Sequence, residues 1–186
     1  LACLGISTST GISFRRLLQS GDDYSELVWL YELCDSIEGW AIQVPDNISE
    51  ETEMRLYNEF RSIAKGNGAI SERVVGLLAG PNRVGKLTFS RIRLALALRD
   101  WIHGRELADI ETEYEVYSGT IASASDVVSW LADGAFYLMG AMGIGLSRRI
   151  RLKKLALGAR YGMPMAARRL YAGAKGRLSR REILLL

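Results

Sequence analysis

The sequence predicts an all-α fold, a bundle of several helices followed by a short basic helical segment. Apolar residues recur at helical spacing along most of the chain, and the breaks fall at clusters of Gly, Pro and Asn. Almost no segment shows the alternation typical of a half-buried strand. With 186 residues, of which 48% are hydrophobic and 24% charged, the chain is long enough to bury a core.

The N-terminal half is expected to hold four helices separated by short connectors. In the second of them, Leu27, Leu30 and Leu33 form an apolar side. Asn47 lies three residues before Glu50 and is expected to cap the third helix. The connector at 39–45 leaves room for a brief extended stretch. The four expected helices span residues 11–20, 22–37, 49–65 and 71–78.

The C-terminal half continues as helices with Gly-rich turns between them. The longest one carries a core-facing stripe of Val127, Trp130, Leu131, Ala135 and Leu138. Ser179 and Glu182 have the spacing of a capping box and should open a last helix. The other expected helices span residues 86–103, 106–116, 121–142, 147–159 and 165–172.

The charge is divided unevenly along the chain. Residues 1–145 hold 12 Lys/Arg and 20 Asp/Glu, whereas residues 146–186 hold 12 Lys/Arg and one acidic residue. So basic a segment favours a polyanionic partner, because Lys and Arg that neutralise phosphates release counterions. A solubilising tail or a contact with an anionic membrane would also use such a segment.

Composition excludes several classes of protein. The two cysteines, Cys3 and Cys34, cannot build a disulfide framework or a tetrahedral metal site, so a reducing cytoplasm is expected. His103 is the single histidine, and residues 134–146 are too short an apolar run for a membrane span. The start at Leu1 and the apolar end at 183–186 lead us to expect a piece of a longer protein.

Residues 80–86 have the glycine and lysine spacing of a phosphate-binding loop. Such a loop would use Lys86 to reach the terminal phosphates. Leu87 stands where Ser or Thr should hold magnesium, and no series of strands follows. A plain turn between helices is therefore the favoured interpretation, although residues 74–79 could pass for a buried strand.

No pairing of a nucleophile with a base is apparent elsewhere. The alternate spacing of four acidic residues on one expected helix spreads them around its circumference, which favours a solvated face over a metal site. They are Asp109, Glu111, Glu113 and Glu115.

Several segments, in the right order, resemble archaeal Ski-type superfamily-two DNA helicases. Residues 93–102 are similar to that family's run ending in Asp-Trp-Ile, and residues 114–119, followed by Trp130-Leu131, resemble the start of its ratchet helix. Residues 160–164 resemble the segment that precedes a helix-hairpin-helix, and residues 176–181 resemble the Gly-Arg-x-x-Ala-Arg of that hairpin. Residues 5–10 look like the segment that leaves the winged helix.

The resemblance implies a domain division and a role. Residues 1–20 would end a winged helix, 21–160 would form a ratchet-like helical bundle, and 161–186 would begin a truncated helix-hairpin-helix. In that family the Trp of the ratchet helix stacks on a base of the single strand leaving the motor. Three departures limit how much of that family's function the resemblance implies here. Ser123 replaces the family Arg, Thr120 replaces an acidic residue, and Arg180 replaces a small residue.

The leading hypothesis is a non-motor module of an ATP-dependent DNA helicase that guides single-stranded or forked DNA. The expected partners are DNA and the motor domains of the parent chain, with no membrane. This region itself would need no cofactor and would not be an enzyme, while ATP and magnesium would belong to the parent motor. The candidate nucleic-acid contacts are Trp130, Ser123, Arg93, Arg99, Arg148, Arg149, Arg151, Lys153, Lys154, Arg177, Arg180 and Arg181.

Two other hypotheses remain open at this point. One is a helical protein-interaction domain whose basic C-terminal segment docks an acidic partner. The other is a nucleotide-binding protein that uses residues 80–86. From spacing alone Trp130 and Trp101 could each be core residues, since a Trp on a helical apolar stripe is usually buried.

Overall fold

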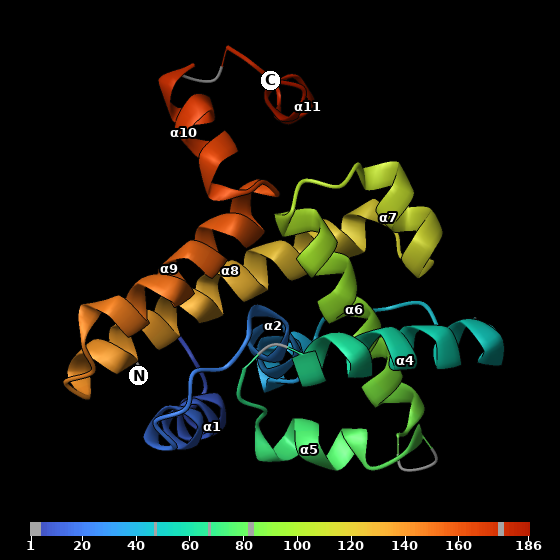
Figure 1. The fold of residues 1–186 in the computed structure, drawn as a ribbon, viewed down its shortest axis with the longest axis vertical. Helices are drawn as coiled ribbons and strands as arrows, with labels where there is room; N and C mark the ends of the chain where they lie inside the picture. The colour runs from blue at the N-terminus through green and yellow to red at the C-terminus, as the bar shows by residue number, and fades with distance from the viewer. Residues whose placement is uncertain (1–4, 47, 67, 82–83, 175–176) are drawn as a thin grey trace.

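The computed structural model describes residues 5–46, 48–66, 68–81, 84–174 and 177–186, and these form an all-α fold (Figure 1). No strand occurs in these ranges, where the only β-type pairing is an isolated bridge between Tyr24 and Ala69. The predicted fold class is therefore confirmed. The helices are α1 (Thr8–Gln19), α2 (Glu26–Cys34), α3 (Ile37–Trp40), α4 (Glu50–Gly66), α5 (Glu72–Leu78), α6 (Lys86–Ile102), α7 (Leu107–Tyr114), α8 (Ser118–Ala141), α9 (Leu146–Tyr161), α10 (Met165–Gly173) and α11 (Arg180–Leu184).

Helix α6 is the centre of the bundle. Its residues from Ser90 to Leu98 are all buried, and the helix packs against α2, α4, α7, α8 and α9. A helix that is covered on every side needs few polar residues, and the run from Leu94 to Leu98 has none. Two arginines on this buried helix, Arg91 and Arg93, donate to backbone carbonyls instead of reaching solvent.

Helices α8 and α9 form a long antiparallel pair that crosses the molecule diagonally in Figure 1. A turn of four residues, 142–145, joins them, and this short connection makes them antiparallel neighbours. Leu152, Leu155, Ala156 and Ala159 make the buried side of α9. This pair lies at the edge of the bundle, and one face of α8 is exposed to solvent.

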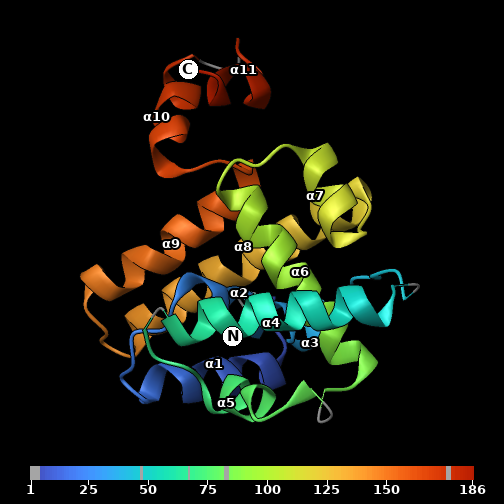
Figure 2. The same cartoon turned by 45° about the vertical axis from the view of Figure 1, so that its right-hand side comes forward.

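Helices α10 and α11 stand apart from the main bundle, at the top of Figures 1 and 2. They share a small apolar cluster of Met163, Ala167 and Ile183, separate from the large core. Leu184 of α11 also reaches the turn after α6, where a Cβ on Gly104 would lie 2.8 Å from its Cδ2. The capping box predicted at Ser179 and Glu182 is present at the start of α11.

The expected helix at residues 22–37 is shorter than predicted. Ser25 accepts a hydrogen bond from the backbone N–H of Val28 at 3.3 Å, so α2 starts at Glu26. Ser36 caps α3 in the same way through the N–H of Gly39, at 3.0 Å. The start of the predicted connector at 39–45 is thus helical. The cap expected at Asn47 lies outside the described residues.

The strand interpretation of residues 74–79 is wrong. Most of the segment belongs to α5, whose N-cap Ser71 is buried and accepts from the N–H of Val74 at 3.2 Å. No described helix of the chain is long and apolar enough to cross a membrane.

Candidate nucleic-acid interface

Helix α8 presents a line of solvent-facing residues along one side. Ser123, Trp130 and Tyr137 are seven residues apart, which places them close to one face of the helix. Ser123 is exposed, Trp130 is 37% exposed and Tyr137 is 54% exposed, whereas Leu131 and Ala135 of the same helix are fully buried. We call Ser123, Val127, Trp130 and Tyr137 the α8 stripe.

Trp130 is neither a core residue nor a fully free one. The N-terminal turn lies against its ring, since a Cβ on Gly5 would be 3.3 Å from Cζ2 of Trp130. One turn further along, Ile6 covers Gly134, where a Cβ would come within 2.1 Å of Cδ1 of Ile6. The backbone before α1 therefore covers part of the Trp130 ring, and the residue as a whole remains 37% exposed.

A hollow of about 380 Å³ lies beside the first half of the stripe. Ser123 and Val127 line it together with Thr120, whose hydroxyl donates to the carbonyl oxygen of Gln43 at 3.3 Å. Ser123 and Thr120 thus contribute small hydroxyl groups, and no charge, to this hollow. Helix α8 contains no Lys or Arg, so any phosphate contact near the stripe has to come from other elements.

Arg93 is not the solvent-facing side chain that the sequence suggested. It is 2% exposed, its guanidinium donates to the carbonyl of Pro45, and burial lowers its pKa. Its Nε and Nη1 have no hydrogen-bond partner among the described residues. Arg99 is half-buried and lies 3.7 Å from a carboxylate oxygen of Asp100. Neither arginine lies on α8 or presents a free guanidinium beside the stripe.

The basic residues of α9 are largely used to fasten this helix to its neighbours. Lys153 pairs with Asp133 of α8 at 2.8 Å, and Arg151 pairs with Asp23. Arg148 donates to the carbonyl of Asp22 at 2.7 Å. These partners lie 20 to 128 residues away in the sequence, so spacing along α9 could not indicate them.

Arg149 lies over the ring of Phe136, with 4.4 Å from the guanidinium carbon to the ring centre, and donates to the Phe136 carbonyl at 3.3 Å. Lys154 differs from the other four predicted positions of α9. Its side chain is exposed and makes no ion pair with the described residues.

Among the three predicted contacts of the C-terminal segment, Arg177 and Arg181 are exposed and Arg180 is half-buried. Arg180 donates to the carbonyls of Gly162, at 2.6 Å, and Arg105, at 2.8 Å. Its guanidinium also covers the ring of Trp101. Arg180, which stands where the resemblance implied a small residue, thus forms part of the packing between α11 and the bundle.

The structure around residues 80–86 is not that of a phosphate-binding loop, which would connect a strand to a helix. The helix α5 precedes it in place of a strand, and Gly85 caps α6 without a side chain. Lys86 is exposed at the start of α6, while Asn82 and Arg83 lie outside the described residues. Within the described part of the chain, no group of three or more His, Cys, Asp or Glu residues could hold a metal ion.

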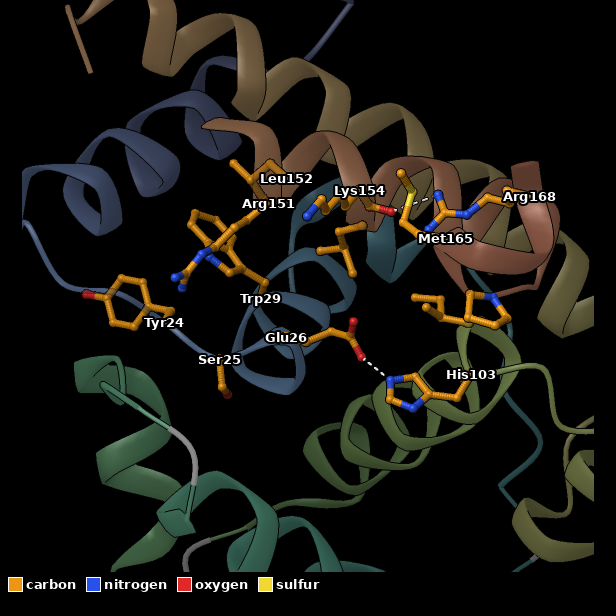
Figure 3. Close-up of a pocket in the computed structure, with 13 residues that line it drawn as sticks. Tyr24, Ser25, Glu26, Trp29, His103, Arg151, Leu152, Lys154, Met165 and Arg168 are labelled. Atoms are coloured by element: carbon orange, nitrogen blue, oxygen red, sulfur yellow. Dashed lines mark hydrogen bonds and ion pairs between the residues drawn. The ribbon is translucent and has the colours of Figure 1, made fainter. Parts of the chain in front are cut away.

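A cavity missed from the sequence lies between α2, the end of α6, α9 and the start of α10 (Figure 3). Trp29 of α2, Arg168 of α10 and His103, which directly follows α6, all line it. The hydrogen bond from the imidazole of His103 to Glu26, at 2.8 Å, raises the pKa of His103. No local pattern could have indicated this group, because its members are far apart in the chain.

Comparison with known families gives one match. Residues 82–162 match the family model described as archaeal helicase, domain 4, a region that covers less than half of the chain and runs from the start of α6 to the end of α9. A search of curated proteins found no match. The chain therefore contains a helicase-associated region, and this region includes the α8 stripe.

Proposed function

We propose that this chain is a non-motor module of an ATP-dependent DNA helicase and that the α8 stripe guides single-stranded DNA. The observation that carries the proposal is Trp130, a large aromatic ring that is 37% exposed on the longest helix of the matched region. Aromatic side chains bind single strands by stacking on bases, which needs no particular sequence.

Phosphate contacts in this proposal come from exposed cations outside α8. Lys154, Arg177 and Arg181 are exposed, and none of the three makes an ion pair with the described residues. Arg148, Arg151 and Lys153 already contact protein groups and are expected to contribute less. Since Ser123 cannot provide an ionic grip, stacking carries a larger share of the binding here than it would beside an arginine.

The test is equilibrium binding of a labelled single-stranded oligonucleotide, followed by fluorescence anisotropy across a salt series. Binding should fall as salt rises, since phosphate contacts release counterions. Trp130→Ala should weaken it by roughly fivefold or more, because one stacked base contributes about 1–3 kcal/mol. Trp40→Ala is the matched control, since Trp40 is 56% exposed but lies on α3, outside residues 82–162 that the family model matches and outside the α8 stripe.

The alternative is a protein-interaction domain that docks an acidic partner through the basic C-terminal segment. It predicts little affinity for oligonucleotides at physiological salt and no effect of Trp130→Ala. Single-strand binding that is equal in wild type, Trp130→Ala and Trp40→Ala would rule out the stripe as the contact.

A further inference from the structure

The cavity beside α9 has the size of a small-molecule site. Its volume is about 400 Å³, which lies within the range of roughly 300–1,000 Å³ found for ligand pockets. Residues of α2, α6, α9 and α10 line it, together with the segments before α2 and α10. None of these belongs to α8, so the cavity is separate from the stripe.

Positive charge prevails around the cavity. Arg151, Lys154 and Arg168 line it, and Glu26 is the single carboxylate among the lining residues. Arg151 is paired with Asp23. Two cations that line the cavity therefore make no ion pair with the described residues, the Lys154 ammonium and the Arg168 guanidinium. In Figure 3 the Arg168 guanidinium meets the backbone oxygen of Lys154, and the Lys154 ammonium points away from it, towards Trp29.

Arg168 is incompletely satisfied. Its Nη1 donates to the carbonyl of Lys154 at 3.2 Å, but its Nε is buried and has no hydrogen-bond partner among the described residues. A buried donor without a partner is costly, and an acceptor bound in the cavity would remove part of that cost. An anionic oxygen suits this position.

The rest of the lining is apolar and partly aromatic. Trp29 is half-buried and lies edge-on to Tyr24, with ring centres 6.0 Å apart and an angle of 83° between the planes. Leu155 and Met165 add aliphatic surface. A ligand with a flat apolar body would bury that body against these side chains, with its anionic group directed to Lys154 and Arg168.

The opposite wall holds a polar pair. The carboxylate of Glu26 is hydrogen-bonded to His103, across the cavity from Lys154 and Arg168 in Figure 3. A carboxylate accepts hydrogen bonds only, so this wall suits an N–H donor. The cavity thus combines an anion site, an apolar surface and an acceptor.

We propose that this cavity binds one nucleotide unit, with the phosphate on Lys154 and Arg168, the base against Trp29 and Met165, and an amino group of the base near Glu26. A free mononucleotide and a single nucleotide of a bound strand share this chemistry. The site goes beyond the proposed function, because it does not involve Trp130. Lys154 belongs to both proposals, so the loss of binding in Met165→Trp, which keeps Lys154, is the result that separates the cavity from the strand contacts.

Titration calorimetry of the whole chain with adenosine monophosphate, and separately with a short adenine oligonucleotide, tests the proposal. Lys154→Glu should weaken binding at least tenfold, since it replaces the unpaired cation with a repelling charge. Met165→Trp should do the same by filling the cavity; Met165 is 37% exposed, so the fold should tolerate the larger side chain. Arg160→Glu is the control, because it makes the same charge change at an exposed position of α9 outside the cavity.

Each outcome has one meaning. Mononucleotide binding that both cavity variants lose supports a free nucleotide as the ligand. Oligonucleotide binding alone, reduced by the same variants in a Trp130→Ala background, supports a nucleotide of a strand and remains separable from the stripe. Binding of neither probe, or an equal loss in Arg160→Glu and no loss in Met165→Trp, would overturn the proposal.

Discussion

The guanidinium of Arg180 lies over the ring of Trp101, with 4.0 Å from its central carbon to the ring centre. Gly162 lies against the same ring, and the indole N–H of Trp101 donates to the carbonyl of Ala159 at 2.9 Å. Trp101 is thereby the point where the end of α6, the end of α9 and the start of α11 meet. This contact holds the two C-terminal helices on the bundle.

We expect Arg180→Ala to release α10 and α11 from the bundle. The variant loses two hydrogen bonds to carbonyls and the contact with Trp101, so the free energy of unfolding should fall by about 1–3 kcal/mol. Hydrogen exchange should become faster in α10 and α11 and stay unchanged in α8. Arg180→Lys should not restore protection, because an ammonium lacks the planar fork of donors; full protection in the lysine variant would contradict this account.

Gly162→Ala should be more destabilising than Gly143→Ala. Both glycines have positive φ values, 60° and 74°, where an L side chain costs about 1–2 kcal/mol. A Cβ at Gly162 would also lie 2.1 Å from Cε2 of Trp101, whereas nothing lies within 4 Å of one at Gly143. Displacing the Trp101 ring should lower the free energy of unfolding of Gly162→Ala by about 1–3 kcal/mol more than that of Gly143→Ala, as measured by chemical denaturation of both variants. Equal losses of unfolding free energy in the two variants would show that the Trp101 ring moves aside at no cost.

The Glu26–His103 pair should make stability depend on pH. The pKa of His103 is raised above its ordinary value of 6.5 by the hydrogen bond to Glu26. The stabilisation is therefore present in full below pH 6.5 and is lost as the pH rises through the raised pKa of the folded state. The effect should be small, since the side chain is 56% exposed.

His103 is the single histidine of the sequence, so its imidazole resonances can be titrated by NMR without assignment. The pKa should return towards 6.5 in Glu26→Gln. A wild-type pKa at or below 6.5 would contradict the pairing.

Arg93→Met should leave single-strand binding unchanged. The guanidinium is buried on α6 and makes one hydrogen bond, to Pro45, while two of its nitrogens lack partners in the described residues. Replacing a poorly satisfied buried charge with an apolar side chain of similar length should change the free energy of unfolding by no more than about 1 kcal/mol. A large loss of oligonucleotide affinity in this variant would show that Arg93 reaches the strand in another conformation.

The helices could be predicted from the sequence because their signals are local. Apolar spacing and Gly-rich turns placed α6 and α9 within a few residues of their observed bounds. The capping box at Ser179 was visible for the same reason. The start of α2 was misplaced, because Asp22 and Ser25 are both good capping residues and only the fold selects Ser25.

The site was harder to predict because exposure and pairing depend on distant residues. A Trp on an apolar stripe is usually predicted to be a core residue, and the partial exposure of Trp130 depends on where the turn at Gly5 lies. The density of Lys and Arg in α9 suggested a free basic surface. Asp23 and Asp133 neutralise part of it, and no pattern within α9 carries that information.

The most direct test of the central claim is photo-crosslinking of single-stranded DNA that contains 5-iodouracil, followed by mass spectrometry of the linked peptides. The account predicts a principal crosslink at Trp130 in α8, which disappears in Trp130→Ala while crosslinks elsewhere persist. Crosslinks that map only outside residues 118–141, on a folded chain that binds the strand, would contradict it.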